Sequence, residues 1–206
     1  MIKHIWFDFS ETLGSITKEA HENLRHETYA KLVGKKINED LRKEYEDLRE
    51  KHKSNSAVFK SLGKPVTFWA KLVGAVDPKT FYSLTDENIP NVLQEMSKII
   101  PISIFSNIDA DKILSTLGVD LKLFTHFISA SEIDAPKPAL EGFYKMIELS
   151  KLPAEEILYI GDHLEKDVIP AKKVGIKSGV VFEKIPEADY YFKDFKDILR
   201  FVKENI

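Results

Sequence analysis

Polar side chains follow several short apolar runs of this sequence, and their residue types are those of a catalytic site. Carboxylates that gather at one point repel one another unless a cation neutralises them, so such a cluster favours metal-dependent chemistry. Each residue alone also has an ordinary interpretation, as a turn residue, a helix cap or a solvated helix start. The set comprises Asp8 after the first run, Ser106 and Asn107 after the second, Lys137 at the start of a helical pattern, and Asp162 and Asp167 after a later run.

Short apolar runs alternate with helical patterns through most of the chain, and this alternation predicts the elements that position those residues. Strands alternating with helices of this length are typical of an α/β fold with a doubly wound parallel sheet. The runs are continuously apolar, as strands buried on both faces require. Ligands bind beyond the carboxyl ends of such strands, so the polar residues should share one sheet edge. We predict strands at 2–7, 99–105, 124–129, 157–160 and 179–182, and helices at 111–117, 138–149, 168–174 and 195–202.

The stretch 14–87 differs from the rest of the chain because it contains no strand pattern. Apolar residues recur there at helical spacing, for example Leu41, Tyr45 and Leu48. A wholly helical segment between the first and second strands is expected to be an inserted cap. We therefore predict a core domain of residues 1–13 and 88–206 and a helical cap domain of residues 14–87. A long crossover with extra helices is the alternative.

Four motifs resemble those of the haloacid dehalogenase-like (HAD) hydrolase superfamily. They are IWFDFSETL at 5–13, FSN at 105–107, KP at 137–138 and GDHLEKD at 161–167, of which the last is the most specific. The resemblance covers essentially the whole chain. It also places the helical insert where one subfamily carries its α-helical cap, between the first and second motifs. The resemblance thus implies a Rossmann-like HAD core with an inserted all-helical cap domain.

The resemblance implies a catalytic and metal-binding role for five residues. Asp8 would be the nucleophile that forms an aspartyl-phosphate, and Lys137 a point charge that restrains it. Mg²⁺ would be held by Asp8, the backbone carbonyl of Ser10 and Asp162, because this hard cation prefers oxygen ligands. Asp167 would support a metal-bound water or Lys137. These roles predict a Mg²⁺-dependent phosphatase or phosphotransferase.

Substrate binding is expected of Ser106, Asn107, Lys137 and Thr12. Ser106 and Lys137 would bind phosphate oxygens, and Thr12 would hold the motif loop in place by a hydrogen bond. The substrate class that the resemblance implies is a small phosphorylated metabolite. The cap would set specificity, and cap residues follow no transferable code.

Ser10 departs from the family pattern. In phosphatases of this superfamily that position usually holds a second Asp, which donates a proton to the leaving oxygen and later takes one from the attacking water. A serine hydroxyl cannot donate a proton effectively near neutral pH, so ordinary alkyl phosphates should be poor substrates. Glu11, the adjacent carboxylate, could substitute for that Asp, but the backbone is expected to point its side chain elsewhere.

Two other function classes remain open. A 2-haloacid dehalogenase would use Asp8 to displace halide from carbon without a metal, but that branch typically lacks the pattern that carries Asp162 and Asp167. A catalytically impaired module would bind phosphate or Mg²⁺ without turnover. Metal-dependent phosphoryl transfer is favoured because carboxylates beside Asp8 are costly without a cation.

Composition limits the classes further. The 206 residues include 30 Lys and Arg against 33 Asp and Glu, which is not the basic excess of a general nucleic-acid binder. Cysteine is absent, which excludes disulfides, thiolate zinc sites and cysteine nucleophiles. No apolar run approaches the roughly 20 residues of a membrane helix, and the N-terminal residues turn polar too early for a signal peptide. We expect a soluble, cytoplasmic protein that binds neither nucleic acid nor membranes; the sequence does not indicate its oligomeric state.

Overall fold

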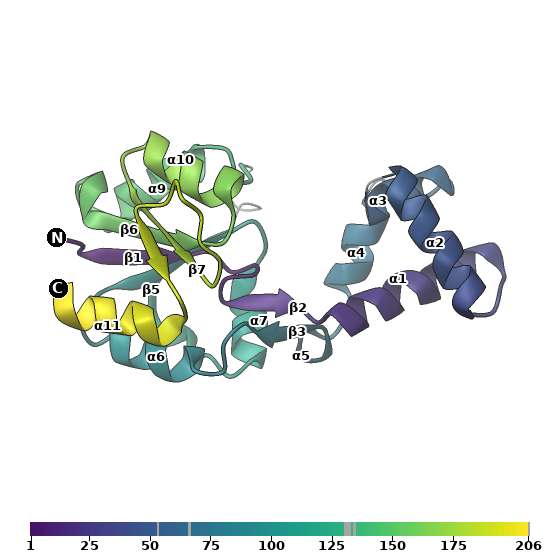
Figure 1. The fold of residues 1–206 in the computed structure, drawn as a ribbon, viewed down its shortest axis with the longest axis horizontal. Helices are drawn as coiled ribbons and strands as arrows, with labels where there is room; N and C mark the ends of the chain where they lie inside the picture. Colours follow the sequence, from purple (N-terminus) through teal and green to yellow (C-terminus); the bar gives the residue numbers. More distant parts are fainter. Residues whose placement is uncertain (53, 66, 130–132, 134, 206) are drawn as a thin grey trace. The chain divides into compact units, whose positions relative to one another are not determined.

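The computed structural model describes every residue except 53, 66, 130–132, 134 and 206, and it divides into two compact units. Met1–Ser15 and Tyr82–Ile206 form the first, which we call the α/β unit. Ile16–Phe81 forms the second, the helical unit. Figure 1 follows the chain through both by colour.

Six parallel strands form the main sheet of the α/β unit, in the order β5-β4-β1-β6-β7-β8. β1 lies between β4 and β6, and Phe7 is level with Ile104 on one side and with Ile160 on the other. The chain adds strands first on one side of β1 and then on the other, which confirms the predicted doubly wound sheet. The strands are β1 (His4–Phe7), β4 (Ile102–Ser106), β5 (Phe124–Ser129), β6 (Ile157–Gly161), β7 (Lys177–Val181) and β8 (Tyr190–Phe192).

Helices cover both faces of this sheet (Figure 1). On one face, Ile5 and Phe7 of β1 share a buried cluster with residues of α6 (Ile89–Met96), α7 (Ala110–Thr116) and α11 (Phe195–Asn205). On the other, Trp6 belongs to a cluster with residues of α9 (Glu141–Ser150) and α10 (Ile169–Lys173). Alternate residues of β1 are therefore buried on opposite faces, which explains why its sequence is apolar without interruption.

Some predicted boundaries differ from the structure. The strand predicted at 179–182 spans Lys177–Val181 instead, because Ser178 is buried with its hydroxyl 3.0 Å from Oδ2 of Asp189. β8 was not predicted, since three residues are too few to show a period. The described part of this unit also contains the 3₁₀ turns η1 (Leu121–Leu123) and η2 (Ala154–Glu156) and the π-helical turn η3 (Leu164–Val168).

An aromatic core holds the helical unit together. Tyr29, Tyr45, Phe59 and Trp69 are buried there, and the Phe59 and Trp69 rings stack with centroids 5.4 Å apart. The Tyr45 hydroxyl donates a hydrogen bond of 2.8 Å to Oδ1 of Asn55, so the buried phenol is satisfied. The helices are α1 (Lys18–Val33), α2 (Glu39–His52), α3 (Asn55–Ser61), α4 (Phe68–Gly74) and α5 (Pro78–Phe81).

The prediction that 14–87 contains no strand is wrong at its two ends. β2 (Gly14–Ile16) and β3 (Tyr82–Leu84) pair there as a separate two-stranded sheet. Each strand has only three residues, which is too short for an alternating pattern. Gly14 is needed because a Cβ atom there would lie 2.7 Å from Cζ of Phe9.

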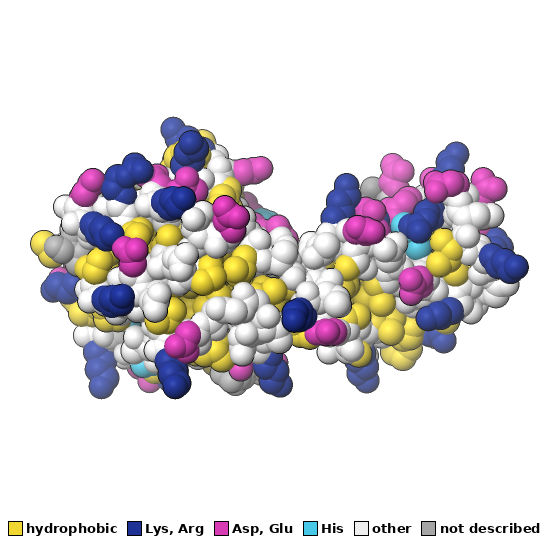
Figure 2. Space-filling view, turned by 90° about the horizontal axis from the view of Figure 1, so that it is seen from below, with side chains coloured by type: hydrophobic (Ala, Val, Ile, Leu, Met, Phe, Trp, Pro, Cys, Tyr) yellow, Lys and Arg dark blue, Asp and Glu magenta, His cyan; other side chains and the backbone are white. Residues whose placement is uncertain are grey.

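The face of the molecule seen in Figure 2 carries charges of both signs. Figure 2 shows Lys and Arg side chains interspersed with Asp and Glu on the visible face of each unit. This mixture of charges on the visible face agrees with the small net charge of −3. Of the helices in the described part of the chain, none combines the length and the apolar character needed to cross a bilayer.

Candidate active site

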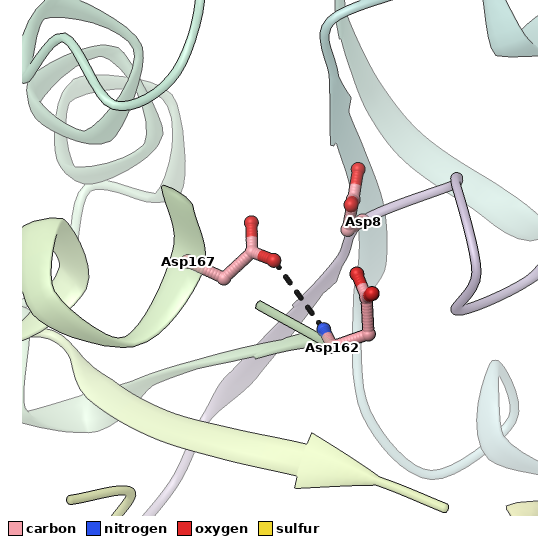
Figure 3. A group of neighbouring side chains, drawn as sticks. All are labelled: Asp8, Asp162 and Asp167. Atoms are coloured by element: carbon pink, nitrogen blue, oxygen red, sulfur yellow. Dashed lines mark hydrogen bonds between the residues drawn. The ribbon is translucent and has the colours of Figure 1, made fainter. Parts of the chain in front are cut away.

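Three carboxylates meet at the carboxyl edge of the main sheet. Asp8 follows β1, Asp162 follows β6, and Asp167 lies in η3, and one oxygen from each lies within 4.8 Å of the others (Figure 3). The parallel pairing of β1 and β6 sets the first two side by side, because Phe7 is level with Ile160. Asp8 and Asp167 are buried and Asp162 is partly buried.

Backbone N–H groups fix the carboxylate of Asp167. Its Oδ2 accepts hydrogen bonds from the backbone N–H of Asp162 at 3.3 Å and of His163 at 3.0 Å, the first of which is drawn in Figure 3. The preceding residue of β6 must be glycine, because a Cβ atom on Gly161 would lie 2.5 Å from Cγ of Asp167. Gly161 therefore makes room for Asp167.

The ammonium of Lys137 joins this cluster. Its Nζ lies 2.9 Å from Oδ1 of Asp8, 2.6 Å from Oδ1 of Asp167 and 2.6 Å from the hydroxyl of Tyr159. Lys137 is 5% exposed, so these contacts lie away from bulk water. An ammonium has three N–H donors, and the three oxygens match them in number.

Asn107 fixes the backbone that carries Lys137. Its Oδ1 accepts the backbone N–H of Lys137 at 2.7 Å, and its Nδ2 donates to the Lys137 carbonyl at 3.2 Å. The neighbouring Ser106 is buried, and its Oγ accepts the backbone N–H of Ile108 at 3.2 Å. Both residues thus stand at the site, and their binding of substrate stays a prediction.

A cavity of about 200 Å³ opens at the cluster. Ser10 lines it and is exposed. The expectation that Glu11 points elsewhere is wrong: Glu11 also lines the cavity, because its backbone adopts a φ of 55° in the left-handed region. The lining residues are Asp8, Ser10, Glu11, Asn107, Lys137, Asp162, His163, Lys166 and Asp167.

Burial and crowding of like charges perturb the titration of the cluster. Burial raises the pKa of Asp8 to about 6, with the charge of Lys137 opposing and that of Asp167 adding to the rise. Burial and the charge of Asp167 raise the pKa of Asp162 to about 6. For Lys137, burial acts to lower the pKa, but the charges of Asp8 and Asp167 outweigh it and raise the pKa above its usual value.

The donor set fits a divalent cation. Three carboxylates against one ammonium leave a formal charge of −2 at the ionised cluster. Carboxylate oxygens are the ligands that Mg²⁺ prefers, and a divalent ion would offset this charge. The raised pKa values of Asp8 and Asp162 report the cost of ionising them without one.

A family model described as haloacid dehalogenase-like hydrolase matches residues 3–181 of the chain. The match spans all four motifs and the residues of the carboxylate cluster. This chain belongs to the haloacid dehalogenase-like hydrolases.

Individual relatives of this HAD hydrolase agree with that assignment. It is 27% identical over 194 residues to the glyceraldehyde 3-phosphate phosphatase of Methanocaldococcus jannaschii, covering 85% of this chain and 83% of that protein. The structure of a HAD phosphatase from Thermococcus onnurineus matches with a TM-score of 0.73 and 17% identity, covering 98% of each chain. The HAD-hydrolase YfnB of Bacillus subtilis, described as bound to magnesium, matches with a TM-score of 0.71 and 16% identity over 100% and 99% of the two chains.

Thr12 of this hydrolase does not hold the motif loop in the way the sequence suggested. Its side chain is fully buried, and within the described residues its Oγ1 has no hydrogen-bond partner. The loop is held through the Thr12 carbonyl instead, which accepts the hydroxyl of Thr85. Thr12 is also absent from the described residues that line the cavity, and its binding of substrate stays a prediction.

Sequence reasoning missed Tyr159 at this site. The residue lies within β6, and its position in an apolar run marked it only as core. The polar tip of a buried tyrosine usually finds a hydrogen-bond partner, which was the available signal. Burial first, and then the charges of Asp167 and Asp8, raise the pKa of the Tyr159 hydroxyl well above its usual value, so it is protonated at neutral pH.

Proposed function

We propose that this HAD hydrolase is a Mg²⁺-dependent phosphatase or phosphotransferase that acts on a small phosphorylated metabolite through an aspartyl-phosphate on Asp8. The observation that carries the proposal is the convergence of three carboxylates on one point, with the Lys137 ammonium against Asp8. The similarity to a phosphatase of Methanocaldococcus jannaschii supports the same reaction class.

Two hydrogen-bond donors contact the same carboxylate oxygen of Asp8 and stabilise the ionised form that a nucleophile needs. The backbone N–H of Phe9 lies 2.6 Å from Oδ1 of Asp8, and the Lys137 ammonium lies 2.9 Å from the same atom. Both contacts favour the ionised carboxylate. We assign the attack on phosphorus to the other oxygen, Oδ2, which forms the Asp8–phosphorus bond as the leaving oxygen departs.

Mg²⁺ would be held by Asp8, Asp162 and the backbone carbonyl of Ser10, with Asp167 reaching it through water. When bound, the ion supplies positive charge that lets a carboxylate approach a phosphate dianion and that stabilises the transferring group. Asp167 is fixed by two backbone N–H groups and by Lys137, so it is suited to orient other groups.

Phosphate oxygens would be bound by Ser106, the last residue of β4, and by Asn107, which follows it. The three N–H donors of Lys137 are matched to protein oxygens, so its contribution to substrate binding is charge rather than a hydrogen bond. Ser10 supplies no general acid, which favours substrates whose leaving group departs as a stable anion.

We infer that the helical unit, Ile16–Phe81, is the cap domain of this enzyme. It interrupts the α/β unit between β1 and β4, where the capped subfamily carries its insert. The unit is shorter than the predicted range of 14–87. The two ends of that range contain β2 and β3, which pair as a separate two-stranded sheet. A cap excludes water from the reaction and sets which substrates are accepted.

The test is hydrolysis of p-nitrophenyl phosphate with Mg²⁺ and with EDTA, beside chloride release from 2-chloropropionate. We expect phosphate release that requires Mg²⁺ and that is lost in Asp8→Asn. Chloride release without metal would assign the protein to the dehalogenases instead. Silence in both assays, with Mg²⁺ binding retained, would indicate a module without turnover.

A further inference from the structure

Tyr159 carries a buried polar group at the border between the core and the active site. The residue is 1% exposed, and its ring meets the ring of Phe143 edge-on with centroids 5.3 Å apart. The Phe105 ring lies 6.2 Å away on the same side of the sheet. The side chains of Tyr159, Phe105 and Phe143 are apolar except for the Tyr159 hydroxyl. That hydroxyl is therefore the one polar atom of these three side chains that can bond to Lys137.

Among the described residues, three polar atoms lie within hydrogen-bond distance of the Tyr159 hydroxyl. The ammonium of Lys137 lies 2.6 Å away, Oδ1 of Asp167 3.1 Å away and the carbonyl oxygen of Phe105 3.2 Å away. An ammonium only donates, so the hydroxyl accepts from Lys137. Its single proton then goes to Asp167 or to the Phe105 carbonyl, and every polar atom of the group is satisfied.

One N–H of the Lys137 ammonium has the Tyr159 hydroxyl as its acceptor among the described residues. Two N–H groups are directed to Asp8 and Asp167, and the third has the Tyr159 hydroxyl as its acceptor. The cation also lies 5.3 Å from the centroid of the Tyr159 ring and 5.6 Å from that of Phe105. Tyr159 and Phe105 therefore provide a hydrogen-bond acceptor and two aromatic rings beside the ammonium.

We propose that Tyr159 is a positioning residue for Lys137. Its hydroxyl accepts the third N–H of the Lys137 ammonium and thereby fixes that ammonium between Asp8 and Asp167. Without that acceptor the ammonium would be free to rotate its third donor toward the substrate phosphoryl group and away from Asp8. The inference deepens the proposed function and rests on it for the catalytic consequence. The contact itself exists whatever the reaction is.

The first test follows the ammonium directly by ¹H–¹⁵N NMR of protein labelled at lysine. A buried, hydrogen-bonded ammonium should give a slowly exchanging signal, assigned by its loss in Lys137→Gln. We expect Tyr159→Phe to shift or broaden this signal. The matched control is Tyr45→Phe, which removes the same atom from a buried tyrosine of the helical unit and should leave the signal unchanged. An identical signal in wild type and Tyr159→Phe would overturn the proposal.

The second test measures catalysis with p-nitrophenyl phosphate and Mg²⁺. Tyr159→Phe should lower kcat about 10–100-fold, as loss of a group that orients a site residue typically does, and leave KM within about twofold because Tyr159 does not touch substrate. In a Lys137→Gln background the same change should have little further effect, since Tyr159 acts through Lys137. Tyr45→Phe should lower the unfolding midpoint without lowering kcat.

The outcomes separate the two proposals. If wild type has no phosphatase activity, the proposed function fails, and the NMR comparison still decides whether Tyr159 fixes Lys137. If Tyr159→Phe changes the signal but not kcat, or if its loss of kcat adds fully to that of Lys137→Gln, the positioning role is overturned while the proposed function stands.

Discussion

Nζ of Lys137 lies 2.9 Å from Oδ1 of Asp8, and both side chains are almost completely buried, with 2% and 7% of their surfaces exposed. In a pair of opposite charges buried this deeply, each charge is stabilised mainly by the other. Removing either partner leaves the other charged in a medium that solvates it poorly.

Lys137→Met should therefore destabilise the protein strongly. The change strands Asp8 and Asp167 without their cation, and breaking a buried pair in this way typically costs about 3–5 kcal/mol. Urea unfolding at pH 7.5 without Mg²⁺ measures it. Lys145→Met removes an exposed ion pair with Glu148 and should cost less than about 1 kcal/mol. Equal costs for the two variants would contradict a buried network at Lys137.

Mg²⁺ should stabilise the folded protein through the carboxylate cluster. At ten times its dissociation constant, a ligand adds about 1.4 kcal/mol, which is about 3–6 °C in Tm for a chain of this size. Asp162→Asn should abolish most of the shift, because it removes a proposed ligand. Asp47→Asn, at an exposed position of α2, should keep the wild-type shift. A shift that survives in Asp162→Asn would place the metal elsewhere.

The rate of hydrolysis should fall steeply as the pKa of the leaving group rises. Without an acid at Ser10 the oxygen must leave as an anion, and general acid catalysis is worth about 10²–10⁴-fold. A series of phosphate esters measures the slope, and acyl phosphates should exceed sugar phosphates. Ser10→Asp should speed the alkyl esters selectively and flatten the slope.

A shallow slope in the wild type would contradict that expectation and would direct attention to Glu11. Glu11 lines the same cavity, and burial raises the pKa of its carboxyl above the usual value. Glu11→Gln should leave the slope unchanged if no residue protonates the leaving oxygen. A steeper slope in Glu11→Gln would identify Glu11 as the proton source.

Gly161→Ala should damage the site although the backbone of Gly161 is of an ordinary conformation. The added Cβ would lie 2.5 Å from Cγ of Asp167, so Asp167 must move. Overpacking of this kind typically costs about 1–3 kcal/mol, and activity should fall with it. Gly74→Ala is the control, because a Cβ there meets no atom within 4 Å. It should leave activity unchanged and keep or raise the unfolding midpoint.

Acid should weaken the fold through His4. Burial, and then the nearby His126, lower the pKa of His4 to about 4 in the folded protein, below the value of about 6.5 in an unfolded chain. The unfolded state therefore binds the proton first, so the contribution is complete above pH 6.5 and lost as the pH falls toward 4. Its size is about 3 kcal/mol.

His4→Gln should make the stability less dependent on pH over that window. The amide can still bond to Oγ of Ser103, which lies 2.8 Å from Nε2 of His4. Asp8 and Asp162 have raised pKa values and act with the opposite sign, so the difference between variant and wild type is the quantity to measure. Parallel curves for the two proteins would show that folding does not shift the pKa of His4.

The sequence predicted the main sheet and the residues at its edge, because continuous apolar runs that end in a polar residue are typical of buried parallel strands. Continuous apolar runs followed by Asp8, Ser106 or Asp162 indicated strands that end at a common edge, and the structure has that sheet. The placement of Lys137 against Asp8 followed from the resemblance, and the geometry agrees with it. The assigned roles of these residues remain predictions.

The rest depended on three-dimensional contacts that no local pattern carries. Tyr159 reads as one more apolar residue of a buried strand, and only the fold reveals what its hydroxyl meets. Glu11 reaches the cavity through a left-handed backbone, a conformation that its residue type does not signal. β2 and β3 are too short to show a period, and their pairing joins residues far apart in the chain.

The central place of β1 has a consequence for how the enzyme is made. β1 leaves the ribosome well before its two sheet neighbours, β4 and β6, although it pairs with both of them. At about 5–20 residues per second, about 8–30 seconds of synthesis separate Asp8 from Asp167. Over that interval the nascent chain carries Asp8 without Asp167 beside it, and the three carboxylates can meet only once β6 and η3 have been made.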